Sequence, residues 1–245
     1  NGLHKPSVRT VVDAIAADLQ AHKGSGIVLA GASQPAIVHA IVHAINESLG
    51  NAGKTIVYTD AVEADPFDQM ESLRTLARDM EAGNVDTLIM AGVNPVYDAP
   101  ADLNFSAALQ KVNHRIHMGV YQDETSDLCH WHIPEAHYLE SWGDCRAFDG
   151  TVSFIQPLIA PLYGGKTIIE LMAALFGKGG SAYDLVRKHW QEKRGTDGFE
   201  TFWRQSLAKG VLDNSAFQPK PLAVRAGVAA KPQEPVQQSG LEVSF

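Results

Sequence analysis

Hydrogen-bonding side chains gather at the turns that follow short apolar segments of this 245-residue chain. The apolar run Thr87–Met90, for example, leads into Gly92-Val-Asn94-Pro95. In an open parallel sheet such turns meet beyond the carboxyl ends of the strands, which is where ligands bind. The candidate ligand-binding residues at these turns are Gly31, Ser33, Gln34, Asp60, Gly92, Asn94, Pro95, Asp123 and Thr125.

The first of these turns, GASQPA at residues 31–36, lacks the composition of a dinucleotide-binding loop. That loop needs three glycines, for a tight turn, for close approach of the backbone to pyrophosphate, and for helix packing. Because only Gly31 is present, ordinary NAD binding is not favoured. Asp60 ends the next apolar segment, where a ribose-binding acid would stand, but an Asp that caps a turn accounts for it equally.

The Gly-x-Asn-Pro sequence also has a purely structural interpretation. Gly92 allows backbone conformations that other residues avoid, and Asn94 can hydrogen-bond to nearby backbone. Pro95 fixes its own φ and biases Asn94 towards extended backbone. The spacing alone leaves open whether this segment binds a ligand or only turns the chain.

Thiol and imidazole groups gather between residues 129 and 145. Cys129, His130 and His132 are of the types that bind zinc, but their spacing matches no standard Cys-x2-Cys site. A second pair, His39 and His43, lies away from the apolar face of its predicted helix, which favours a solvent-facing or partner-facing pair. The chain has no Gly-x-Ser-x-Gly elbow, and nothing singles out an acid or a base, so we predict no catalytic residue.

Alternating helical and strand-like segments must position these turns. Apolar residues at helical intervals predict helices, and short apolar runs predict buried strands. The expected helices cover residues 7–22, 35–50, 67–83, 103–111, 166–177, 183–192 and 199–208, and the expected strands cover 27–31, 55–60, 87–92 and 116–121, with a fifth within 132–140. Buried strands separated by helices call for a parallel sheet covered on both faces. We therefore predict an α/β fold with a doubly wound, mostly parallel, Rossmann-like sheet.

The sequence changes character after Gly150, where an extended segment precedes further helices. From Pro219 onward the chain is rich in Pro, Ala and Gln, a composition that does not support a packed core. We expect a Rossmann-like domain at residues 1–177, a helical appendage at 178–218, and an irregular Pro-rich linker or strap at 219–245.

The amino-acid composition argues against several classes of function. A hydrophobic content of 45% allows a substantial core, and a net charge of -8 without a basic block argues against nucleic acid as a partner. Two cysteines are too few for a disulfide framework or for an iron–sulfur cluster held within this chain. No apolar run approaches the roughly 20 residues needed to cross a bilayer, so we expect no direct membrane insertion. Because the sequence begins at Asn1, we expect a piece of a longer polypeptide or a processed product.

The middle of the chain resembles the Rossmann-like third domain of the molybdopterin oxidoreductase superfamily. That family's pattern is a strand with Gly-x-Asn-Pro, a strand running into Glu-Thr, then Leu-Pro, Leu-Glu-x-x-Gly and Asn-x-Glu-Gly-Arg-Val. The corresponding sequences here are Gly92-Val-Asn94-Pro95, Glu124-Thr125, Ile133-Pro134, Leu139-Glu140-Ser-Trp-Gly143 and Asp149-Gly150-Thr151-Val152. Order and spacing hold from about Thr87 to Gly177.

The departures from this pattern fall where that family contacts a bis-pterin guanine dinucleotide cofactor. The family's Ala-Asp before Leu-Pro is Cys129-His130 here, its Asn is Ala147, and its Glu-Gly-Arg is Asp149-Gly150-Thr151. Losing an Asn and an Arg removes donors suited to a polar, phosphate-bearing ligand.

A subgroup of the family is more similar. GASQPAIVHAIVHAINESLGNAGKTIVYTD, CHWHIPEAHYLESWGD and DGTVSFIQPLIAPLYGG look like the iron–sulfur subunit of bacterial alternative complex III, over about Gly24 to Gly210. The resemblance implies a scaffold domain without molybdenum cofactor in a membrane-bound, quinol-oxidising respiratory complex, with iron–sulfur clusters elsewhere in the parent chain. It also implies a soluble fragment at the periplasmic side of the bacterial inner membrane, with other domains and subunits of the complex as partners.

Three alternatives stay open. A molybdopterin guanine dinucleotide-binding domain of an active molybdenum oxidoreductase predicts pterin affinity at the candidate residues, although such an enzyme needs further cofactor-binding domains and a metal ligand that we cannot place in this chain. A structural, subunit-docking domain predicts no small-molecule affinity. A zinc protein would use Cys129, His130 and His132.

Overall fold

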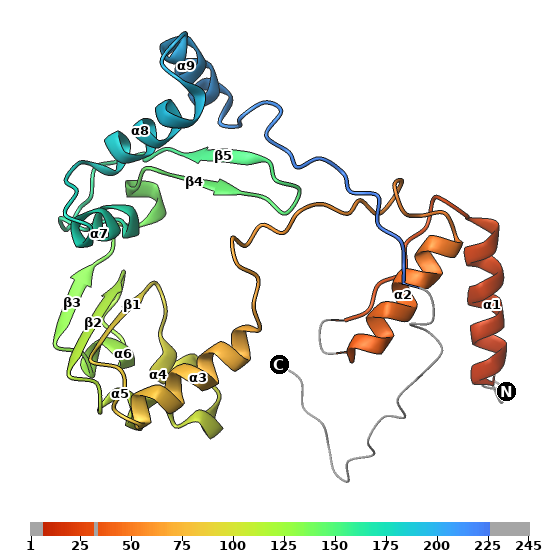
Figure 1. Cartoon of the computed structure of the whole chain (residues 1–245), viewed down its shortest axis with the longest axis horizontal. Helices are drawn as coiled ribbons and strands as arrows, with labels where there is room; N and C mark the ends of the chain where they lie inside the picture. The colour runs from red at the N-terminus through yellow and green to blue at the C-terminus, as the bar shows by residue number, and fades with distance from the viewer. Residues whose placement is uncertain (1–6, 32–33, 226–245) are drawn as a thin grey trace, which may run out of the picture. The chain divides into compact units, whose positions relative to one another are not determined.

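The computed structural model describes residues 7–31 and 34–225, and it divides the chain into two compact units (Figure 1). The first unit contains residues 1–60 and 217–245, and the second contains residues 61–216. The limits of these units differ from the domain boundaries expected at 177/178 and 218/219. The expected domain boundaries stay a prediction. Of the Pro-rich tail expected at 219–245, residues 226–245 lie outside the described part.

Two helices dominate the first unit. Helix α1 spans Val8–Ala21, and Ser7 caps it by accepting a hydrogen bond from the Thr10 amide. Helix α2 spans Ala36–Ser48 and begins directly after Pro35. Both agree with the sequence analysis, because the apolar spacing and the first-turn signals coincide at these positions.

The strands expected in this unit, residues 27–31 and 55–60, are wrong: neither segment is a strand, and Leu29 is 76% exposed. The buried amide of Asn46 takes the place of a neighbouring strand, because it accepts a hydrogen bond from the Val28 N–H at 3.0 Å and donates one to the Val28 carbonyl at 2.7 Å. In the second segment, Ile56 forms an isolated bridge with Ala52. An apolar run identifies a strand only if another strand is present to pair with it.

One part of the second unit is a parallel three-stranded sheet (Figure 1). Its strands are β1 (Thr87–Ala91), β2 (His114–Gly119) and β3 (Trp131–Pro134), in the order β1-β2-β3. The register aligns Met90 with His117, and His117 with His132. Residues aligned in this way point to the same face of the sheet.

Helices follow each of the first two strands. Helix α3 (Gln69–Glu81) precedes β1, and α4 (Pro95–Asp98), η1 (Ala101–Leu103) and α5 (Phe105–Leu109) connect β1 to β2. The short α6 (Glu124–Asp127) connects β2 to β3. Met80 of α3, Met90 of β1 and Leu109 of α5 pack together in a buried core that covers one face of the sheet.

The rest of the second unit is built on an antiparallel hairpin that the sequence analysis did not predict. Strands β4 (Gly143–Arg146) and β5 (Val152–Ile155) pair with each other and follow η2 (Tyr138–Glu140). The helices are α7 (Ile168–Leu175), α8 (Ala182–Arg194) and α9 (Phe199–Lys209). Phe154 of β5, Trp190 of α8 and Trp203 of α9 form the second buried core, which is largely aromatic.

The structure is therefore a mixed α/β fold with a small parallel sheet, as the sequence analysis predicted in outline. Strands at 87–92 and 116–121 and the fifth strand near 132 are present, with ends shifted by a few residues. Across residues 7–31 and 34–225, no helix combines the length and the apolar character required to cross a membrane.

Candidate functional site

The turn after β1 has the conformation that its sequence requires. Gly92 has φ +66°, a region that other residues rarely adopt, and its N–H donates to the Met118 carbonyl at 2.9 Å. Asn94 has φ -121°, and Pro95 follows as the first residue of α4. Gly92, Asn94 and Pro95 thus bend the chain away from the sheet and start a helix at the carboxyl end of β1.

A closed hydrogen-bond network joins this turn to the one after β2. The Thr125 hydroxyl donates to Asn94 Oδ1 at 2.7 Å and accepts from the Val96 N–H at 3.1 Å. Asn94 Nδ2 donates to Glu124 Oε2 at 2.8 Å. Thr125 is fully buried. The two candidate residues Asn94 and Thr125 are therefore brought together, but each spends hydrogen-bonding capacity on the protein itself.

Asp123 organises the second turn. Its carboxylate accepts from the Ser126 N–H at 2.9 Å, and its own N–H donates to Ser126 Oγ at 2.8 Å, which together form the capping box of α6. This short helix places Thr125 against the turn after β1. Asp123 therefore acts here as a helix cap beside the network.

The pKa of the Glu124 carboxyl lies below its ordinary value of 4.5. The largest cause is the hydrogen bond from Asn94, and the second is a hydrogen bond from the backbone N–H of Glu124 itself. We expect the Glu124 carboxyl, followed by NMR, to titrate below that value, and Asn94→Ala to move the midpoint upwards. Because the pKa of Glu124 is lower in the folded state than in the unfolded state, the ionised carboxylate stabilises the fold at pH values above the unfolded-state pKa. This stabilisation is lost as the pH falls through the folded-state pKa. Identical midpoints in the two proteins would show that Asn94 does not bond this carboxylate in solution.

A histidine pair, buried His117 with half-buried His132, lies beside the network and was missed by the sequence analysis. His117 Nδ1 and His132 Nδ1 are 3.0 Å apart, and His117 Nε2 is 3.1 Å from the Val93 carbonyl oxygen. A carbonyl only accepts, so Nε2 of His117 carries a proton and donates it. Asp123 Oδ2 lies 3.8 Å from the same nitrogen. The pair ties the turn after β1 to β2 and β3.

We expect His117→Leu to lower the free energy of unfolding of the second unit by about 1–3 kcal/mol, because the Val93 carbonyl and His132 lose a buried partner. All four tryptophans lie within residues 131–203, so tryptophan fluorescence during urea unfolding reports on this unit. His114→Leu is the matched control, since His114 is exposed on the same strand. Equal losses for the two variants would contradict the proposed role of the pair.

The three candidate zinc ligands have different partners. Cys129 packs against the first buried core, and burial raises the pKa of its thiol. His130 Nδ1 accepts from the Arg115 N–H at 3.2 Å, whereas His132 Nδ1 contacts His117. Among the residues that the structure describes, no group of three or more His, Cys, Asp or Glu side chains is arranged to hold a metal ion.

The remaining candidates belong to the first unit. Gln34 is exposed, and its N–H donates to the Gly31 carbonyl at 3.0 Å. Asp60 forms an ion pair with Lys220, so its carboxylate is engaged within the protein. Ser33 lies outside the described residues.

The strand tips of the second unit therefore hold carboxylates, amides and imidazoles in mutual contact, an arrangement that fixes turns. Asn94, Asp123 and Thr125 each form at least one of these bonds through the side chain, and the Thr125 hydroxyl proton is donated to Asn94. No model of a known protein family matches this chain, and a search of curated proteins found no match either.

Proposed function

We propose that this chain is a scaffold domain of a molybdopterin-oxidoreductase-like subunit, that it holds no molybdenum cofactor, and that it serves a respiratory quinol-oxidising complex. The observation that carries this proposal is the closed network at the strand tips. Asn94 and Thr125, which would contact a pterin, bond instead to each other, to Glu124 and to the Val96 N–H. A pterin that accepted a hydrogen bond from the Thr125 hydroxyl would have to break the bond of that fully buried hydroxyl to Asn94.

Exposed apolar side chains at the same strand tips support a packing role. Val93 and Tyr97 follow β1 and are 53% and 74% exposed, and Val120 and Tyr121 follow β2 and are 46% and 79% exposed. A phosphate-bearing cofactor calls for cationic and polar donors, whereas adjoining apolar side chains are typical of contact with protein. We infer that another domain of the parent polypeptide covers this edge.

Helix α7 supports the docking aspect of the proposal. None of its residues is buried, yet it is apolar on almost every side: Ile168, Met172 and Leu175 are 41–54% exposed. Its one carboxylate, Glu170, is bonded to Thr167 in the capping box. A helix that is hydrophobic all round belongs in the interior of a larger assembly.

We further propose that β1, β2 and β3 are part of a doubly wound, Rossmann-like sheet in the parent protein. Three consecutive parallel strands with intervening helices are compatible with one half of such a sheet. In this account the parent chain carries iron–sulfur clusters in other domains and lies at the periplasmic side of the bacterial inner membrane. The present chain would then frame electron transfer without itself catalysing a reaction.

The proposal is tested by gentle purification of the parent protein from its host's membranes, followed by addition of a quinol without oxygen. Electron paramagnetic resonance then reads the iron–sulfur clusters. We expect the parent to purify with membrane subunits, and its clusters to become reduced by the quinol. A parent protein that purifies as a single polypeptide without iron, or whose clusters a quinol leaves oxidised, would contradict the respiratory role.

A further inference from the structure

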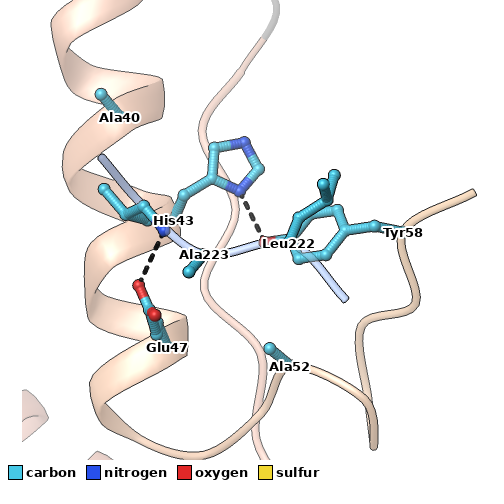
Figure 2. Close-up of a pocket in the computed structure, with 8 residues that line it drawn as sticks. Ala40, His43, Glu47, Ala52, Tyr58, Leu222 and Ala223 are labelled. Carbon is cyan, nitrogen blue, oxygen red and sulfur yellow. Dashed lines mark hydrogen bonds between the residues drawn. The ribbon is translucent and has the colours of Figure 1, made fainter. Parts of the chain in front are cut away.

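A cavity in the first unit has the features of a small-molecule site (Figure 2). Its volume is about 410 Å³, within the range of roughly 300–1,000 Å³ that is usual for ligand pockets. Small or apolar residues make most of its lining, including Ala40 of α2, Ala52, Leu222 and Ala223. The alanines leave open the space that larger side chains would fill.

The wall formed by residues 222–224 is held at both ends. The Lys220 N–H donates to the Tyr58 carbonyl at 2.7 Å, and the Lys220 ammonium forms an ion pair with Asp60. At the other end of the wall, the Val224 N–H donates to Glu47 Oε2 at 3.0 Å. Figure 2 shows the segment passing between α2 and Tyr58. These contacts come from both sides of the cavity, so the wall is part of the fold of this unit.

Two hydrogen-bonding groups meet at the cavity. His43 Nδ1 lies 3.0 Å from the Tyr58 hydroxyl oxygen, and the two rings are tilted by 54° (Figure 2). One proton occupies this contact, and within residues 7–31 and 34–225 the structure shows no further hydrogen bond to the second imidazole nitrogen or to the Tyr58 hydroxyl, so both can bond to a ligand. Among the described residues that line the cavity there is no lysine or arginine, and the carboxylate of Glu47 accepts a hydrogen bond from the Val224 N–H. The lining therefore suits a ligand without charge.

We propose that this cavity binds an uncharged, planar aromatic molecule that carries a hydroxyl group. The apolar wall covers the ring system, and the hydroxyl exchanges hydrogen bonds with His43 and Tyr58. A fused bicyclic alcohol is an appropriate size for the cavity, and its transfer from water onto Leu222 and the alanines is favourable. The proposal does not depend on the scaffold role, because the residues that carry it lie in a different unit from the strand-tip network.

The test is a titration of the whole 245-residue chain, labelled with ¹³C at the alanine methyl groups, with 2-naphthol as the probe. The methyl signals of Ala40, Ala52 and Ala223 should shift together and saturate, while those of Ala77 and Ala108, which are buried in the second unit, should stay in place. Naphthalene, which lacks the hydroxyl, should bind about tenfold more weakly, the factor that corresponds to one net hydrogen bond.

Two variants with matched controls sharpen the test. Tyr58→Phe should weaken 2-naphthol binding about three- to tenfold and leave naphthalene binding unchanged, whereas Tyr163→Phe, at an exposed tyrosine, should change neither. Ala40→Leu should fill the cavity and abolish binding of both molecules. Ala223→Leu fills it from the opposite wall, and retained side-chain amide signals of Asn46, which is buried and bonded to Val28, verify that the first unit of each variant is folded.

Three results would overturn the proposal. The first is the absence of saturable shifts at the three lining alanines up to the solubility limit of 2-naphthol. The second is equal affinity for naphthalene and 2-naphthol, which would mean that His43 and Tyr58 play no part. The third is binding that survives both Ala40→Leu and Ala223→Leu in the folded protein, which would place the site elsewhere.

Discussion

Thr125→Val is expected to lower the free energy of unfolding of the second unit by about 2–4 kcal/mol, because it removes a hydroxyl on which two other groups depend. Valine has nearly the same shape, so packing is retained. The Val96 N–H then loses its acceptor, and Asn94 Oδ1 loses its donor, at a fully buried residue. Urea unfolding, followed by tryptophan fluorescence, measures the loss.

Thr87→Val is the matched control for this experiment. Thr87 lies on β1 in the same unit, is exposed, and bonds only to the neighbouring Asp86 side chain among the contacts that the structure shows for its hydroxyl. We expect its change to stay within about 0.5 kcal/mol. If Thr125→Val were as mild as the control, the network would not be closed in solution, and its groups would be available to a ligand.

Trp203→Ala is expected to cost the second unit about 3–5 kcal/mol, the usual loss when a large aromatic side chain is removed from a core. Trp203 is 2% exposed and packs on Phe154 and Phe199, with ring centroids 5.2 and 5.9 Å away. Its indole N–H also donates to the Tyr183 hydroxyl at 3.2 Å. One substitution therefore opens a cavity at the meeting point of β5, α8 and α9.

Circular dichroism during urea unfolding measures this loss without depending on the residue that was removed. Trp131→Ala is the control, because Trp131 is 71% exposed on β3 and its removal leaves no cavity. We expect a change within about 0.5 kcal/mol for the control. Losses of similar size in both variants would contradict the second core as described.

Sequence reasoning located most helices because several local signals agree at their ends. Ser7 and Asp68, for example, cap α1 and α3 through their side chains. Strands were harder to predict than helices, because an apolar run does not identify the strand that pairs with it. Thr87–Ala91 became a strand beside β2, whereas within residues 27–31 the backbone of Val28 bonds to the side chain of Asn46.

The β4–β5 hairpin was missed although its turn contains Asp149-Gly150, a dipeptide that favours hairpin turns. The turn is closed by hydrogen bonds from the Ala147 N–H to the Thr151 carbonyl and from the Gly150 N–H to the Ala147 carbonyl, both 2.8 Å. The flanking strands are only four residues long, so they show too little alternation of apolar and polar residues to indicate a pair of strands.

The residues of the candidate site could be predicted from the sequence, but the hydrogen bonds between them could not. Asn94, Asp123 and Thr125 stand out because they follow strands, yet Asn94 and Thr125 are 31 positions apart, and only the fold shows that they bond to each other. His117 was missed because it lies within the strand. The usable signal was its place among apolar residues in HRIHMG, since a polar side chain in a buried strand needs a partner.

The measurement that tests the scaffold account most directly is the metal and pterin content of the full-length parent protein, purified gently from its host. Elemental analysis gives molybdenum, tungsten, iron and zinc, and the fluorescence of acid-oxidised extracts gives pterin. The account predicts iron without molybdenum, tungsten or pterin. Molybdenum or tungsten near one per protein, together with pterin, would contradict it and would make the strand tips cofactor contacts.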